Sequence, residues 1–198
     1  MQRWDEVEQF LVDEAARDLE AGATVRPCLA AFRGEQPLLI VFLREFDKGA
    51  YADPITEVLC IAMGLAADRL MFSISGRAWS LDDPVPPVVP GFGDLRQRIV
   101  HITRVDGSGA AICARDIMLP FDVRDGVVQW GPRLEEESAE GWIPRVLRIA
   151  VEQCSALAAS DADLRAQVLR CDRLGHLVGI SPEVSQRLAL EPSALEGL

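Results

Sequence analysis

The sequence is poor in the residues on which metal and hydrolase sites most often depend. Among 198 residues there are only two histidines. His101 lies in a strand-like stretch and His176 near the end of a helical one, and neither has a cysteine, histidine or carboxylate at zinc-ligand spacing. The paired motifs of the zinc deaminases are also missing. Isolated histidines usually pack or lie at the surface, so we expect no metal site and no cofactor.

Cysteine is present, but without any pairing pattern. The sequence has five cysteines, an odd number, and no two of them stand in C-x-x-C spacing. The first residues, MQRWDEVEQF, lack the apolar core of a signal peptide. Scattered thiols without an export signal are typical of a reducing compartment, so we expect free thiols and a cytoplasmic protein. The cysteines are Cys28, Cys60, Cys113, Cys154 and Cys171.

An excess of positive charge and a long apolar run are both missing. Asp and Glu number 31 against 20 Lys and Arg, which gives a formal net charge of −11. Nucleic acids and anionic membranes both attract basic residues, and the longest aliphatic run, Leu38–Leu43, is too short to cross a bilayer. The sequence therefore predicts neither a nucleic-acid nor a membrane partner. Lys48 is the only lysine, which indicates the codon bias of a GC-rich bacterial genome.

Motifs for nucleophiles and phosphates are incomplete. Ser75 precedes Gly76 at a strand end, but the G-x-S-x-G pattern fails because Ser73 stands two residues earlier. Cys60 lies among apolar residues of a helical stretch, where a structural thiol is the default. The stretches GFGDLR and DGSGAA lack both the full G-x-G-x-x-G pattern and the Walker lysine. Covalent catalysis and nucleotide binding therefore receive little support.

The arrangement of apolar residues predicts an α+β protein. Spacings of three and four residues indicate helices, alternation indicates strands, and Asp53 before Pro54 is typical of a helix start. We expect a mixed sheet with an embedded βαβ unit, antiparallel hairpins, an N-terminal helix and a C-terminal helical segment. The predicted elements are a helix over 2–20, a hairpin of strands 24–32 and 37–46, a helix over 54–67, a strand over 69–75, and hairpins at 97–118 and 121–130.

A proline-rich loop and an acidic stretch divide this pattern. Residues 82–94 are expected to form an extended loop because prolines recur in it. Residues 135–141 are the expected linker between an α+β domain, residues 1–134, and a helical segment, residues 142–198, packed on the same domain. The end of that segment has the helix-turn-helix pattern, but its acids outnumber its bases, so we interpret it as a helical hairpin.

The predicted βαβ unit places two loops at one edge of the sheet. Ligands commonly bind outside the carboxyl ends of parallel strands. The Arg77 guanidinium can bind a carboxylate or phosphate, and the Trp79 ring can stack on a planar group. No general base stands out, which favours recognition over catalysis. The rim formed by the 47–53 and 76–83 loops consists of Lys48, Tyr51, Asp53, Arg77, Trp79, Asp82 and Asp83.

Three interpretations of this rim stay open. In the first it is a tied corner, in which Arg77 pairs with Asp82 or Asp47 and Trp79 covers the core. In the second it is the docking surface of a non-catalytic binding or regulatory module, which takes another protein or a small anionic or planar ligand. In the third it is the active site of a small metal-independent, hydrolase-like enzyme that uses Asp53, Arg77 and the two following aspartates.

A further expectation concerns assembly. The stretch VVQW, residues 127–130, is apolar and falls at the end of the predicted sheet. An exposed sheet edge can pair with a second chain. We therefore also expect a homodimer formed through edge strands or through the C-terminal helices.

Overall fold

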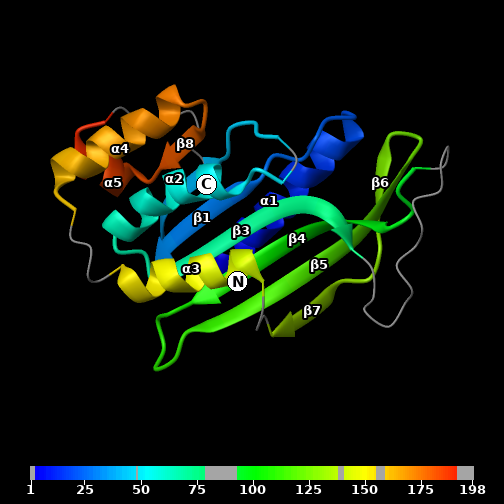
Figure 1. Ribbon diagram of the computed structural model, residues 1–198, viewed down its shortest axis with the longest axis horizontal. Coiled ribbons are helices and arrows are strands. Elements are labelled where there is room, and N and C mark those ends of the chain that lie inside the picture. The colour runs from blue at the N-terminus through cyan, green and yellow to red at the C-terminus, as the bar shows by residue number, and fades with distance from the viewer. Residues whose placement is uncertain (1–2, 48, 79–92, 138–140, 155–158, 191–198) are drawn as a thin grey trace.

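Helices and one sheet make up this computed structural model, which describes residues 3–47, 49–78, 93–137, 141–154 and 159–190. The order of elements confirms the α+β class, with a helix first and helices near the end (Figure 1). The helices are α1 (Arg3–Glu20), α2 (Ala52–Gly64), α3 (Trp142–Gln153), α4 (Asp161–Arg173) and α5 (Pro182–Leu188). The strands are β1 (Cys28–Arg33), β2 (Gln36–Phe42), β3 (Arg69–Ala78), β4 (Gln97–Asp106), β5 (Cys113–Arg124), β6 (Val127–Trp130), β7 (Leu134–Glu137) and β8 (Leu177–Ile180).

The strands form an eight-stranded sheet in the order β6-β5-β4-β3-β1-β2-β8, and β7 also pairs with β5. β1 is antiparallel to both β2 and β3, so these two strands run parallel to each other, and α2 connects them. The expected βαβ unit is therefore present, with β1 between its strands. Because β1 takes that place, every pairing among the described residues is antiparallel, and the sheet is antiparallel rather than mixed.

The two faces of the sheet carry separate apolar clusters. α1 covers one face, where the Trp4 and Phe32 rings meet edge to face with centroids 5.0 Å apart. α2, α3, α4 and α5 cover the other face, where Leu70 of β3, Leu147 of α3 and Leu164 of α4 belong to one cluster (Figure 1). Alternate residues of each strand supply the two clusters, as expected for a sheet buried on both faces.

Capping signals predicted the starts of the last two helices. The Ser160 hydroxyl accepts a hydrogen bond from the Asp163 N–H at 3.2 Å, and Ser181 caps α5 in the same way. α2 differs, because it begins at Ala52 with Tyr51 as N-cap and has no side-chain cap bond. Asp53 therefore lies in the first turn of α2 and not at the N-cap. A carboxylate there is still favoured by the helix dipole.

Two short strands lie where other structure was expected. β7 occupies part of the predicted acidic linker and pairs with β5, with Leu134 opposite Met118. β8 lies between α4 and α5 and pairs with β2, so this region is helix, strand and helix rather than a helical hairpin. The β4–β5 and β5–β6 hairpins are confirmed. Within the described ranges, no helix combines the length and apolar character needed to cross a bilayer.

Candidate functional site

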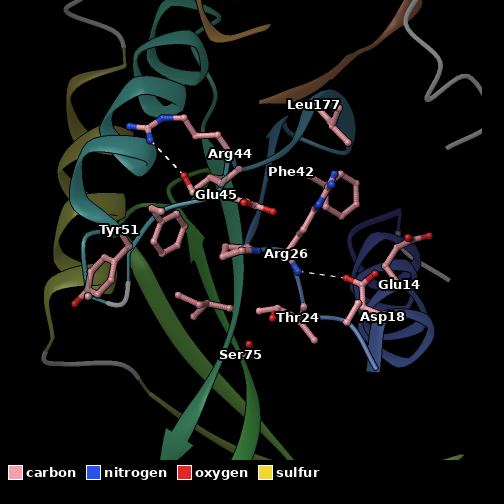
Figure 2. Close-up of a pocket in the computed structure, with 17 residues that line it drawn as sticks. Glu14, Asp18, Thr24, Arg26, Phe42, Arg44, Glu45, Tyr51, Ser75 and Leu177 are labelled. Atoms are coloured by element: carbon pink, nitrogen blue, oxygen red, sulfur yellow. Dashed lines mark hydrogen bonds between the residues drawn. The ribbon is translucent and has the colours of Figure 1, made fainter. Parts of the chain in front are cut away.

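A cleft opens where β3 continues beyond the start of β1. β1 pairs with β3 only as far as Cys28 opposite Ser73, whereas β3 runs on beside β4 to Ala78. The chain reaches β1 from α1, and the backbone N–H of Arg26 donates to Asp18 Oδ2 at 3.3 Å. A cavity of about 1020 Å³ lies at this break in the strand pairing (Figure 2).

The cleft is lined from both faces of the sheet. Phe42 and Ser75 lie on the α1 face, whereas Leu43 and Ile74 lie on the α2 face. Tyr51 bounds the cleft on the α2 face, and its ring packs edge to face on Trp142 with centroids 5.4 Å apart. The cleft therefore passes through the plane of the sheet, with residues of both faces in its lining.

The charged groups that line the cleft differ in whether they form hydrogen bonds and ion pairs with other residues. The Arg44 guanidinium donates to both Glu57 oxygens, at 3.0 and 3.2 Å. The Arg26 guanidinium has no hydrogen bond or ion pair to any described residue, and its side chain extends toward the Phe42 ring in Figure 2. Three carboxylates line the same cleft, and Figure 2 shows Glu45 pointing into it. The three are Glu14, Asp18 and Glu45.

A buried polar cluster fixes the wall that carries Arg44. The His176 side chain is 0% exposed, and its Nε2 lies 2.8 Å from Glu57 Oε2. Because the Arg44 backbone N–H donates to His176 Nδ1 at 3.2 Å, the ring proton is on Nε2 and Nε2 donates to Glu57. Burial raises the pKa of Glu57, but the bonds from Arg44 and His176 outweigh burial and bring that pKa below its usual value.

Of the predicted rim residues that the structure describes, Tyr51 lines the cleft, and Asp53 and Arg77 do not. Tyr51 lines the cleft at the carboxyl ends of β2 and β3, the edge at which the sequence predicted a site. Asp53 is exposed in the first turn of α2 and does not line the cleft. The remaining rim residues apart from Arg77 lie outside the described residues. They are Lys48, Trp79, Asp82 and Asp83.

Arg77 belongs to β3, which ends at Ala78, and not to a loop; the rest of the expected 76–83 loop lies outside the described residues. Its Nη1 donates to the carbonyl oxygens of Asp94 and Arg96, at 2.7 and 2.9 Å. Its Nε lies 3.6 Å from Asp94 Oδ2. Among the described residues, Arg77 thus ties β3 to the start of β4 and leaves the lining of the cleft to others. The described acidic partner of Arg77 is Asp94, whereas the tied-corner interpretation named Asp82 or Asp47. That interpretation also depends on Trp79 and stays a prediction, because Trp79 and Asp82 lie outside the described residues.

Sequence reasoning missed the partners of both histidines. His101 Nε2 lies 2.8 Å from Asp116 Oδ1, which also accepts a 2.7 Å bond from the buried Thr103 hydroxyl. Alternation along β4 and β5 places the two residues on one face, but their register could not be known from the sequence. Among the described residues, no three His, Cys, Asp or Glu side chains gather closely enough to hold a metal ion.

Comparison with known proteins gives no relative. No protein-family model matches the chain, and the searches of curated proteins and of solved structures found no match either. The function is therefore inferred from the geometry and chemistry of the cleft.

Proposed function

We propose that this protein is a non-catalytic binding module whose ligand occupies the cleft at the open end of β1. The observation that carries the proposal is a cavity of about 1020 Å³, lined by apolar side chains and by a few charged groups. Small-molecule sites typically have volumes of about 300–1,000 Å³ and this kind of lining. The cleft also lies at the carboxyl ends of two parallel strands, where ligands commonly bind.

The titratable groups favour recognition over catalysis. A general acid at neutral pH needs a carboxyl whose pKa is raised toward the working pH. The pKa values of Glu57, Asp94, Asp106 and Glu135 are lowered instead, by hydrogen-bonded arginine, serine or histidine partners. None of these four carboxyls lines the cleft. They stabilise the fold around it rather than supply a proton.

A hydrolase-like enzyme is the second candidate, and one observation favours it. The His101–Asp116 pair, with 2.8 Å between Nε2 and Oδ1, has the geometry of a base and its orienting carboxylate. Neither residue lines the cleft. An esterase and phosphatase screen of wild type and His101→Ala tests this candidate, because turnover that disappears in the variant would replace the binding proposal.

Fragment binding tests the proposed function directly. Ser75 is half-buried and lines the cleft, so Ser75→Trp should fill part of it, whereas Gln129→Trp adds the same bulk on exposed β6. Ligand-observed NMR with neutral, anionic and cationic aromatic fragments should show binding to wild type and to Gln129→Trp. Ser75→Trp should lose it. Equal binding to all three proteins, or to none, would contradict the proposal.

The compartment is also part of the proposal. None of the five cysteines, all of them among the described residues, forms a disulfide, which suits a reducing environment such as the cytoplasm.

A further inference from the structure

We infer that the ligand of this cleft is an extended peptide that adds a strand to the free edge of β3 at Ser75 and Arg77, with basic side chains toward α1 and apolar side chains toward α2. This inference rests on the proposed binding function and specifies its ligand. It follows from the direction of the β3 peptide groups and from the different chemistry of the two faces of the cleft.

The peptide groups of Ser75 and Arg77 face the free edge of β3, and Ser75 lines the cleft at this edge. Gly107 N–H donates to Asp68 C=O at 2.8 Å, and these two residues stand opposite each other in the β3–β4 register. Hydrogen-bonded pairs alternate along an antiparallel ladder, so the even-numbered residues of β3 bond to β4 and the odd-numbered residues face the other edge. β1 occupies that edge only as far as Ser73. Beyond Ser73, no described strand pairs with it.

Such an edge binds peptides by strand addition. Main-chain hydrogen bonds supply affinity, and alternate side chains enter pockets on the two faces of the sheet. The cavity of about 1020 Å³ provides space beside the edge. A Cβ built on Gly76, which would project from the sheet on the same face as Ile74, would meet no described atom within 4 Å, so the α2 face is open there as well. The cleft therefore offers both a hydrogen-bonding edge and room on each face.

The two faces select different side chains. On the α1 face, Ser75 lies across from Asp18 and Glu14 of α1 (Figure 2). On the α2 face, the cleft is lined by Ile74, Leu43 and other apolar groups. A strand presents successive side chains to opposite faces, so a matching peptide alternates basic and apolar residues.

Charge complementarity selects a basic peptide over an acidic one. Asp18 and Glu45 line the cleft without an ion pair to a described residue, whereas Glu14 is paired with Arg17 and the Arg44 guanidinium with Glu57. Arg26 is the one described guanidinium at the cleft without such a partner, and it extends toward Phe42 rather than toward Ser75 (Figure 2). Like charges placed together oppose binding, so glutamate in place of the peptide's lysine should be rejected.

Fluorescence anisotropy with a short dye-labelled peptide that alternates lysine and valine tests the inference. Three control peptides have the same length: a block peptide with the lysines before the valines, a glutamate–valine alternation, and an alternating peptide N-methylated on its edge-facing amides. The alternating lysine–valine peptide should bind at least about tenfold more tightly than each control. Equal binding of the alternating and N-methylated peptides would refute strand addition.

Variants on the protein side locate the site. Ser75→Pro removes the N–H that faces the cleft, whereas Ser75→Ala keeps it, so only the proline variant should lose binding. The N-methylated peptide decides the question by itself if Ser75→Pro does not fold. Asp18→Asn with Glu45→Gln should weaken the lysine peptide about tenfold and reduce its salt dependence. An unchanged affinity in the double variant would contradict the charge complementarity on which the choice of a basic peptide rests.

Failure of this inference is distinguishable from failure of the proposed function. If aromatic fragments bind to the cleft and are lost in Ser75→Trp while no peptide binds, the binding function stands and strand addition is wrong. If neither fragments nor peptides bind, both are wrong.

Discussion

Replacing Glu57 with glutamine should loosen the contacts that hold the segment after β2 and the start of β8 against α2. Glu57 accepts bonds from Arg44 at 3.0 and 3.2 Å and from His176 at 2.8 Å, and its side chain is 18% exposed. Its backbone oxygen also accepts from Gln167 Nε2 of α4 at 3.0 Å. The carboxylate therefore links α2, the segment after β2 and the start of β8.

The size of the effect follows from these contacts. A hydrogen bond to a charged group contributes about 1.5–3 kcal/mol, and breaking a buried pair costs about 3–5 kcal/mol. Glutamine keeps one acceptor oxygen, and the Arg44 side chain is 28% exposed, so water replaces part of the loss. We therefore expect Glu57→Gln to lower the free energy of unfolding by about 2–3 kcal/mol, or roughly 5–10 °C in melting temperature for a chain of this length.

Urea denaturation followed by circular dichroism, with thermal melts beside it, measures the loss. The matched control is Asp122→Asn, which removes an exposed carboxylate 3.7 Å from Arg98 and should change stability by less than about 0.5 kcal/mol. The pKa of Glu57 is lowered in the fold, so its contribution is present above the unfolded pKa of about 4.3 and is lost as the pH falls through the folded pKa. The difference between wild type and Glu57→Gln should therefore shrink in acid. If Glu57→Gln is as stable as the control Asp122→Asn at pH 7, the reasoning is refuted.

Three other outcomes are expected. Gly64→Ala should destabilise the fold by about 1–3 kcal/mol in urea melts, because the new Cβ would overlap the Leu164 side chain of α4, whereas Gly76→Ala should be close to neutral. Arg77→Ala should cost about 1 kcal/mol, since its contacts at the start of β4 are largely exposed, and a loss above about 3 kcal/mol would show a buried role instead. In a thiol-labelling time course, the exposed Cys60 and Cys113 should react first, and the buried Cys171 should react only on unfolding, because burial raises the pKa of Cys171 to about 11. Early labelling of Cys171 would contradict the packing of α4.

Local signals in the sequence predicted much of the fold. Apolar residues at helical spacing marked α1, and serine caps marked the starts of α4 and α5. These signals are local because helix capping and periodicity involve residues only a few positions apart. Register and strand order are not local. β8 is a four-residue strand next to helices, and it forms because β2 offers it an edge.

The same distinction applies to the candidate site. The carboxyl ends of β2 and β3 were expected at one edge, and Tyr51 was expected there, because a βαβ connection makes that placement predictable. Gly76 was expected to end β3, but its pairing with Ile99 carries the strand onward. The Glu57–His176 contact joins residues 119 positions apart, and no local sequence pattern predicts such a pair.

The pairing of β2 with β8 has a consequence for synthesis on the ribosome. The residues of β2 emerge long before Leu177–Ile180, the only described strand that covers its outer edge. At about 5–20 residues per second, the nascent chain exposes this apolar edge for roughly 7–27 s before β8 is synthesised. Unpaired apolar edges invite association with other chains during that time. We expect expression yield to improve with slower initiation or a coexpressed chaperone. A chain that stops before Leu177 should aggregate even though its first seven strands are complete.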